Sequence, residues 1–187
     1  VRVISVHVYM FPVAAQLPET FFLRDPGCWG WATWKRGWDL YDYDGVRHLA
    51  EVRAQGRETE FNLDGSYDYL GMLEERIAGR NSSWAILWYA TAFLQGKLTL
   101  YPGQSLVTNI GFDGSGTHRG NEERFTAALG GQPVHVNEIA VEENLQARAA
   151  LVAFLSTLRE PASLVKRIVS RVRCWVHSFT SAGSPRG

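Results

Sequence analysis

The chain has 187 residues, 45% of them hydrophobic, so it can bury one sizeable core and is expected to form one domain or a domain with a tail. Its formal net charge of zero excludes a general attraction to nucleic acid, and we expect no nucleic-acid partner. Cys28 and Cys174 match no metal-ligand spacing, which favours reduced thiols in a cytoplasmic protein over a disulfide framework. No apolar run has the length of a membrane span, and no signal-peptide pattern is present.

The first part of the chain combines a strand with a segment rich in tryptophan. β-Branched residues in "VRVISVHVYM" partly alternate with others and predict a strand over residues 3–10. Two prolines and a glycine in "QLPETFFLRDPGC" then predict an irregular segment. "GCWGWATWKRGW" holds four of the seven tryptophans, and Trp31, Trp34 and Trp38 have the spacing of one helix face. We therefore expect a helix over residues 31–40, with these three indoles packed in the core.

Two helices and a pair of strands are predicted next. Apolar residues at helical spacing predict a helix over residues 67–79, and "GRNSSW" then supplies a stop and a new N-cap, either Ser82 or Ser83. "WAILWYATAFL" is apolar nearly all round and predicts a buried helix over residues 84–95. "KLTLYPGQSLV" predicts two short strands between residues 97 and 110, separated by a proline–glycine turn.

The remainder of the chain changes in character. After residue 118 it is polar and irregular, apart from a short strand predicted at 133–136, until "LQARAALVAFLSTL" predicts a helix that ends before Pro161. A last helix is expected over residues 164–179, with apolar residues on one face and basic residues largely off it. This helix could lie on the headgroups of an anionic membrane, or it could dock its apolar face against the leucines of the preceding helix.

The stretch "NIGFDGSGTH", residues 109–118, could carry chemistry. Backbone amides freed by its glycines could cradle phosphate oxygens, and Asp113 or His118 could meet a metal ion. It is not a phosphate loop of the Walker type, because the lysine and its spacing are missing. A glycine-rich surface loop that binds nothing is the alternative.

Carboxylates offer a second set of candidates. Asp64 and Asp68 in "FNLDGSYDYLGMLEE" lie near aromatic residues, where a carboxylate could act as a general base. Alternatively, Asp64 or Ser66 caps the helix and Asp68 is solvated. The only D-x-D spacing, Asp42 and Asp44, has no buried strand before it and predicts a solvated turn. Four histidines have no ligand spacing and are expected at the surface or in packing positions, namely His7, His48, His135 and His177.

Three stretches carry a resemblance to a known family: "CWGWATWKRGWDLY", "DGSYDYLGMLEERIAGRNSSWAILWYATAFL" and "LTLYPGQSLVTNIGFDGSGTH". In this order they resemble the second half of bacterial glycosyltransferases with the GT-A fold, of the family 2 type. The resemblance covers residues 1–120. It implies transfer of a sugar from a nucleotide-activated donor to a saccharide or lipid-linked acceptor, and a divalent cation, Mn²⁺ or Mg²⁺, in the full-length enzyme.

The resemblance also implies roles for particular residues. One segment matches the part of such enzymes that lines the sugar pocket, and it consists of Cys28, Trp29, Gly30 and Trp31. Within it, Trp29 and Gly30 are expected at the sugar. Three residues of the glycine-rich stretch are expected to bind substrate, namely Asp113, Gly114 and Ser115. His118 matches a histidine that often helps to hold the metal–diphosphate unit.

The sequence departs from the family pattern in two places. The nucleotide-binding half and its D-x-D motif would precede this sequence, which does not begin with a methionine, so we expect a piece of a longer polypeptide. Asp42 and Asp44 lie on the wrong side of the tryptophan segment to replace that motif. Residues 85–87 are apolar where many GT-A enzymes carry the catalytic carboxylate, which leaves Asp68 as the first candidate base and Asp64 as the second.

The sequence thus predicts an α/β fold, an incomplete GT-A domain that lacks the N-terminal nucleotide-binding half and carries C-terminal helices. Its expected parts are an acceptor-side segment at 1–120, an irregular segment and helix at 121–160, and a basic amphipathic helix with a tail at 161–187. The predicted function is glycosyl transfer, and we expect no activity from this piece alone. The predicted location is the cytoplasm, or the inner face of the plasma membrane if residues 164–179 bind to it. A non-catalytic carbohydrate-binding remnant is the alternative.

Overall fold

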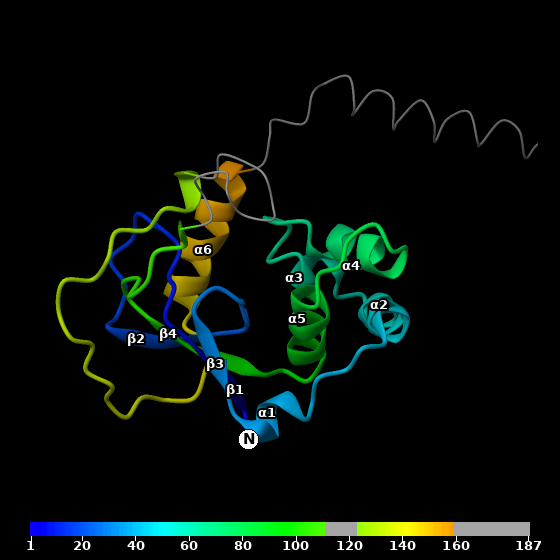
Figure 1. The fold of residues 1–187 in the computed structure, drawn as a ribbon, viewed down its shortest axis with the longest axis horizontal. Helices are drawn as coiled ribbons and strands as arrows, with labels where there is room; N and C mark the ends of the chain where they lie inside the picture. Colours follow the sequence, from blue (N-terminus) through cyan, green and yellow to red (C-terminus); the bar gives the residue numbers. More distant parts are fainter. Residues whose placement is uncertain (111–122, 159–187) are drawn as a thin grey trace, which may run out of the picture. The chain divides into compact units, whose positions relative to one another are not determined.

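A computed structural model describes residues 1–110 and 123–158 (Figure 1). Val1–Ser156 form one compact unit, which contains the whole sheet. Two sequence predictions lie outside the described residues: nearly all of the glycine-rich stretch at 109–118, and the helix at 164–179.

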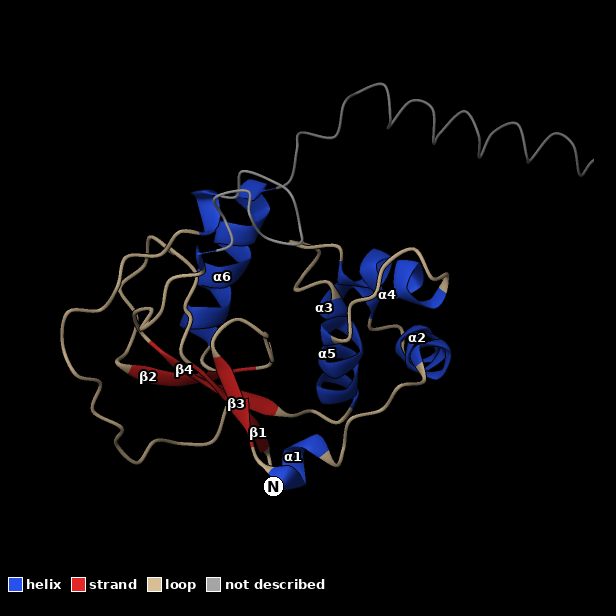
Figure 2. Cartoon of the chain, in the orientation of Figure 1, coloured by secondary structure: helices blue, strands red, loops and turns tan. Residues whose placement is uncertain are grey.

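Four short strands form a mixed sheet with the order β2-β4-β1-β3 (Figure 2). Strand β1 (Val3–His7) runs parallel to β4 (Leu98–Pro102) in the middle of the sheet. Strand β2 (Thr20–Leu23) pairs antiparallel with β4, and β3 (Trp31–Thr33) pairs antiparallel with β1. Because β1 and β4 are parallel, both end at the same edge of the sheet, and the segments that follow them can meet there.

The loop between β2 and β3, residues 24–30, crosses one face of the sheet. The Tyr101 hydroxyl on β4 donates a hydrogen bond to the backbone carbonyl of Asp25 at 2.7 Å. Gly27 then lies against the ring of His7 on β1, since a Cβ on Gly27 would be 2.6 Å from His7 Nε2. The loop therefore carries the chain across β4 and β1 to the edge where both strands end.

A group of helices packs beside the sheet. Helix α5 (Ala85–Leu94) is buried from Ile86 to Phe93, as its apolar sequence requires. Helices α2 (Gly45–Ala54) and α4 (Tyr69–Ile77) pack on it, and the short α3 (Glu58–Phe61) joins them.

The core of this helical group consists of side chains from α2, α3, α4 and α5. They are Val52, Phe61, Leu73, Ile86, Leu87, Tyr89, Ala90 and Phe93. On another side of α5, Trp88 and Ala92 pack with Ile4 of β1. Helix α5 is thus the element that joins the sheet to the helices.

Helix α6 (Leu145–Leu158) begins beside the sheet edge formed by β2. The Asn144 amide donates to the Phe22 carbonyl at 2.9 Å, and Asn144 Oδ1 accepts from the Ala147 amide at 2.8 Å, which caps the helix. A short 3₁₀ helix, η2 (Glu123–Phe125), precedes it. None of the helices within residues 1–110 and 123–158 has the length and hydropathy that a membrane span needs.

The coarse sequence predictions are confirmed. The protein is mixed α/β, with a strand at residues 3–7 and helices within residues 67–79, 84–95 and 145–158. The helix expected over residues 31–40 is wrong. Trp31 belongs to β3, and only Lys35–Trp38 form a helical turn, α1.

The tryptophan spacing misled because it spans too few residues to distinguish a helix from a strand followed by a turn. Gly30 has a φ of +57°, which redirects the chain before Trp31 pairs with His7. Trp34 and Trp38 are 39% and 41% exposed, so neither is a core residue. Trp31 does pack, with ring contacts to Trp38 and to Trp84 and Trp88 of the α5 region.

Several smaller predictions are also wrong. β2 forms within the segment expected to be irregular, because "TFFL" pairs with β4 between the two prolines. β4 is a single strand, and residues 133–136 form none. Neither serine caps α5, because Trp84 is the N-cap residue and the helix has no side-chain cap. Helix α2 was not predicted.

Candidate functional site

Residues 28–31, the tryptophan segment, lie at the edge of the sheet where β1 and β4 end. The Val8 amide donates to the Gly30 carbonyl at 2.8 Å, and the Val8 carbonyl accepts from the Leu106 amide at 2.8 Å. A Cβ on Gly30 would lie 2.9 Å from Val8 Cγ2 and 2.8 Å from Val107 Cγ2. Glycine therefore lets the tryptophan segment, the end of β1 and the stretch that follows β4 approach one another.

Trp29 lies in an aromatic cluster built from distant parts of the chain. The members of this Trp29 cluster are Tyr9, Phe11, Trp29, Phe125 and Phe154. The Trp29 ring centroid is 5.2 Å from that of Tyr9 and 5.4 Å from that of Phe125, both in edge-to-face geometry. The Tyr9 hydroxyl donates to the Phe125 carbonyl at 2.7 Å. Trp29 is half-buried, so it both packs and presents part of its surface.

A buried polar group lies where the 24–30 loop packs on the sheet. It consists of Asp25 of the loop, His7 of β1 and Tyr101 of β4. The rings of His7 and Tyr101 lie 4.7 Å apart, and His7 Nδ1 is 2.8 Å from the Tyr9 carbonyl, to which it donates. The Asp25 side chain is 2% exposed, and its Oδ2 has no hydrogen-bond partner among the described residues. A buried carboxyl without a cation in contact favours its neutral, protonated form.

Burial changes the acid–base properties of this group. Desolvation raises the pKa of Asp25 to about 7, against the opposing effects of the Tyr101 hydroxyl and of the Arg148 charge. Desolvation also lowers the pKa of His7, which favours the neutral ring. The pKa of the neighbouring Cys28 thiol is raised by burial and then by Asp25, so this cysteine is not an activated nucleophile.

A turn with unusual backbone geometry presents Asp64. Leu63 and Asp64 have φ angles of 45° and 55°, and Gly65 continues with 76°. Non-glycine residues rarely adopt this left-handed region, and local strain of this kind clusters at functional sites. Two contacts stabilise the turn: the Leu63 side chain is buried, and the Leu63 carbonyl accepts a hydrogen bond from the Ser66 hydroxyl at 2.7 Å. Residues 63–65 are called the Asp64 turn below.

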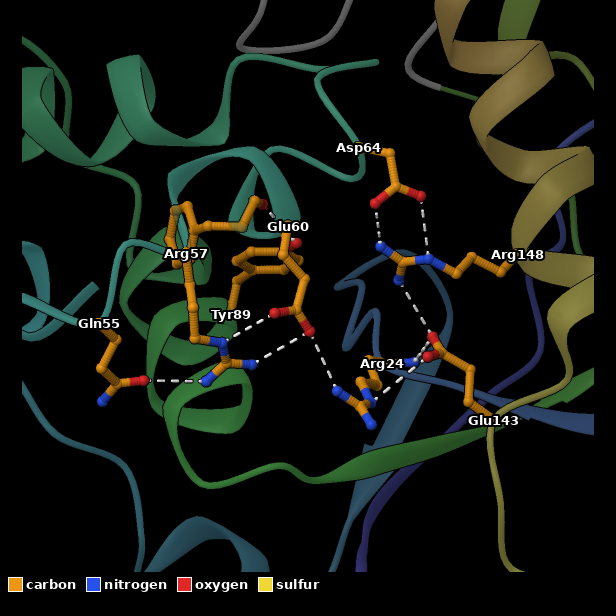
Figure 3. Close-up of polar contacts among 9 residues, drawn as sticks. Arg24, Gln55, Arg57, Glu60, Asp64, Tyr89, Glu143 and Arg148 are labelled. Carbon is orange, nitrogen blue, oxygen red and sulfur yellow. Dashed lines mark hydrogen bonds and ion pairs between the residues drawn. The ribbon is translucent and has the colours of Figure 1, made fainter. Parts of the chain in front are cut away.

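Asp64 ends a chain of six alternating charges that links the helices to the sheet (Figure 3). In order, the residues of this charge chain are Arg57, Glu60, Arg24, Glu143, Arg148 and Asp64. Glu60 lies on α3, Arg24 follows β2, and Arg148 lies on α6. The hydrogen bond from Arg57 is the main reason why the pKa of Glu60 is lowered.

The last link of the charge chain is a two-pronged contact. Arg148 Nε donates to Asp64 Oδ2 at 3.2 Å, and Nη2 donates to Oδ1 at 2.9 Å. Burial alone would lower the pKa of Arg148, but its contacts with Asp64 and Glu143 outweigh burial and raise it. The guanidinium therefore stays charged and holds both carboxylate oxygens of Asp64.

Asp68, the first candidate base, serves a structural role. It is the N-cap of α4, and its Oδ1 accepts from the Gly71 amide at 3.0 Å. A Cβ on Gly71 would lie 2.4 Å from Asp68 Oδ2, so the carboxylate lies tightly against the first turn. The alternative in which Asp64 or Ser66 caps this helix is wrong, because Asp68 does so.

The other predicted residues are placed as follows. Asp44 caps α2 by accepting from the Arg47 amide at 2.9 Å, while Asp42 forms an ion pair with Arg47 and lies 3.2 Å from His48 Nε2. The D-x-D stretch lies in a surface loop with Tyr43 and Asp44 exposed, and it also caps α2 and forms an ion pair. His7 and His48 are buried and His135 is exposed, as expected.

Some predicted site residues cannot be placed. Asp113, Gly114, Ser115 and His118, together with His177, lie outside the described residues. Within residues 1–110 and 123–158, no three His, Cys, Asp or Glu side chains gather as a metal-ion site would require.

Sequence reasoning missed most of the charged residues around Asp64. Arg148 is separated from Asp64 by 84 residues, and Glu143 is separated from Arg24 by 119, so no local pattern reports these contacts. One signal was present. The Asp-Gly dipeptide at 64–65 is typical of a turn with positive φ and could have identified the Asp64 turn.

No protein-family model, no curated protein and no solved structure matches this chain.

Proposed function

We propose that the chain is the acceptor-side part of a family 2-like glycosyltransferase with the GT-A fold. It would act with a nucleotide-binding half that supplies the D-x-D motif. The reaction is transfer of a sugar from a nucleotide-activated donor to a saccharide or lipid-linked acceptor. The motif order in residues 1–120 suggests this function, and the α/β architecture is compatible with it.

One observation carries the proposal. Val8 joins the tryptophan segment to the stretch that leads from β4 toward residues 111–122, through hydrogen bonds of 2.8 Å on each side. The family resemblance assigns substrate binding to the first of these stretches and to residues 113–115, which follow the second in the sequence. The meeting of the two described stretches at one edge of the sheet supports a common site, because loops at strand ends commonly carry function.

Asp64 is the better candidate base in this proposal. Its side chain is 52% exposed, whereas Asp68 is used as a helix cap. In the reaction, the Asp64 carboxylate takes the proton of the acceptor hydroxyl as that oxygen attacks the anomeric carbon and the nucleoside diphosphate departs. A divalent cation would offset charge on the diphosphate. The described residues do not gather three ligands for such an ion.

The test measures nucleoside diphosphate release by the protein expressed from the complete open reading frame that contains residues 1–187. This protein is called the in-frame protein below. Uridine and guanosine diphosphate sugars are supplied as a panel with Mn²⁺ and saccharide acceptors. We expect acceptor-dependent release from at least one donor, and no release by residues 1–187 alone. If the in-frame protein releases nothing with any donor and acceptor, glycosyl transfer is ruled out.

The second candidate function is a non-catalytic carbohydrate-binding remnant. The half-buried Trp29 favours it, because an exposed indole surface can stack on the C–H faces of a sugar. Titration of residues 1–187 with oligosaccharides, followed by tryptophan fluorescence, tests this. Saccharide binding by residues 1–187, when the in-frame protein releases no nucleoside diphosphate, would support the carbohydrate-binding remnant. If neither saccharide binding nor nucleoside diphosphate release is found, both proposed functions are rejected.

A further inference from the structure

We propose that Arg148, on α6, is the positioning residue that holds the Asp64 carboxylate as the catalytic base. This inference rests on the proposed glycosyl transfer and extends it in one respect. The family resemblance covers residues 1–120, so α6 lies beyond it, and no role in the site follows from the resemblance for any residue of this helix.

The contact between the two side chains fixes the orientation of the carboxylate. Arg148 Nε and Nη2 each donate to a different oxygen of Asp64, at 3.2 and 2.9 Å. A fork of this kind removes rotation of the carboxylate, while each oxygen keeps a lone pair that can accept a proton. Because the Asp64 side chain is 52% exposed, those lone pairs are accessible to an acceptor hydroxyl.

Arg148 is itself held before any substrate arrives. Its side chain is 14% exposed, and Nη1 donates to Glu143 Oε1 at 3.2 Å. Glu143 is 12% exposed and also accepts from the Arg24 backbone amide at 3.2 Å (Figure 3). Since this largely buried carboxylate anchors the guanidinium, the arginine cannot swing away from Asp64 without breaking its own hydrogen bond to Glu143.

Stability alone does not explain the ion pair at Asp64. An ion pair with an exposed partner contributes little to stability, and the Asp64 side chain is 52% exposed. A carboxylate needed at a fixed position explains the pair.

Helix α6 also connects this fork to the Trp29 cluster. Phe154 lies six residues after Arg148 on the same helix, which corresponds to a rise of about 9 Å. Its ring is 5.8 Å from Phe11 and 6.0 Å from Phe125, both members of the cluster. Helix α6 therefore contacts the candidate base through Arg148 and two other rings of the Trp29 cluster through Phe154.

A double-mutant cycle tests the proposal in the in-frame protein, with nucleoside diphosphate release as the assay. We expect Arg148→Ala to lower kcat by at least about 10-fold with little change in acceptor KM, because an orientation made for the transition state is lost. In the Asp64→Asn background, Arg148→Ala should then cost less than about 2-fold, since residues that act as a unit are not additive.

Two further variants separate positioning from folding. Arg57→Ala is the matched control, because Arg57 belongs to the same charge chain but pairs with Glu60 and Gln55 and not with Asp64. It should leave kcat within about 2-fold of the parent protein. Millimolar guanidinium should restore part of the kcat of Arg148→Ala, while the same concentration of NaCl should not. Arg148→Lys keeps the charge without the fork and serves if the alanine variant does not fold.

The outcomes are distinguishable. A parent protein that releases no nucleotide rejects the proposed function, and this inference falls with it. A parent that is active while Arg148→Ala behaves like Arg57→Ala, or in which the effects of Arg148→Ala and Asp64→Asn simply add, overturns the inference and leaves the proposed function standing.

Discussion

The 24–30 loop and the Asp64 turn each carry an aspartate, and the two side chains differ in solvent exposure and in charged partners. Asp25 is 2% exposed and contacts no cation among the described residues, whereas Asp64 is 52% exposed and both its oxygens contact Arg148. The 24–30 loop thus buries the Asp25 carboxyl and favours its protonated form. The Asp64 turn leaves the Asp64 carboxylate exposed to solvent, and Arg148 fixes its orientation. Burial and pairing are separate means of controlling one functional group.

Arg148 makes the comparison informative, because its charge reaches both aspartates. It lowers the pKa of Asp25 through space, but this effect is smaller than desolvation, and that pKa remains about 7. With Asp64 it forms two direct hydrogen bonds. Distance and hydrogen-bond geometry therefore decide which carboxylate the arginine controls.

Asp25→Asn should give the largest change, and its sign depends on pH. In the wild type, the folded pKa of about 7 exceeds the unfolded value of 3.8, so the native state holds a proton that the unfolded chain has lost. Stability contributed by this group is full below pH 4 and is lost as the pH rises to 7, by at most about 4 kcal/mol.

The asparagine variant removes this pH dependence and should be the more stable protein at pH 8. Urea unfolding of both proteins at pH 4.5 and pH 8 measures the effect, and the difference between them cancels the other titrating groups. Parallel stability curves for the two proteins would show that Asp25 does not carry a buried proton.

Gly27→Ala should destabilise the 24–30 loop by about 1–3 kcal/mol, since the added methyl overpacks a filled space. Its Cβ would lie 2.6 Å from His7 Nε2. Gly131→Ala is the matched control, because nothing lies within 4 Å of a Cβ at that position. Thermal unfolding compares the two. Equal melting temperatures would mean that the loop does not lie against His7.

Asp68→Ala should cost about 1 kcal/mol, the usual effect of removing an N-cap side chain. The loss arises from the Gly71 amide, which Asp68 now satisfies. Asp39→Ala removes an exposed ion pair with Lys35 and should cost less than about 0.5 kcal/mol. Urea midpoints distinguish these cases, and an Asp68 effect no larger than that of Asp39 would argue against the cap.

Asp64→Asn should have a small effect on stability, below about 1 kcal/mol, because the Asp64 side chain is 52% exposed and Arg148 keeps its ion pair with Glu143. The prediction sharpens the comparison with Asp25, which is controlled by burial. Chemical denaturation under the conditions used for Asp25→Asn checks it. A loss of several kcal/mol would mean that the Asp64 turn is a structural device.

The sequence was most informative where one periodicity extended over several turns. Helix α5 follows from eleven nearly continuous apolar residues, and α6 from its leucines and alanines. It misled where local patterns were short. The spacing of Trp31, Trp34 and Trp38 fits a helix, but pairing of β3 with β1 and the positive φ of Gly30 prevail over it.

The candidate site was only partly predictable. The sequence identified Asp64 and Asp68 as candidate bases. Which of the two is preferred depends on which of them caps α4, and that depends on where the helix begins. Arg148 and Glu143 could not be predicted, because contacts between residues more than eighty positions apart arise from the packing of α6 beside β2. Burial of Asp25 likewise depends on the path of its loop over β4.

The most direct test of the account compares turnover by Asp64→Asn and Asp68→Asn in the in-frame protein. Asparagine is also a good N-cap, so Asp68→Asn preserves α4, and both changes remove one negative charge. We expect Asp64→Asn to lower kcat by at least about 100-fold, because a general base is lost, and Asp68→Asn to stay within about 3-fold of the parent. Equal losses in the two variants, or a larger loss for Asp68→Asn, would contradict it.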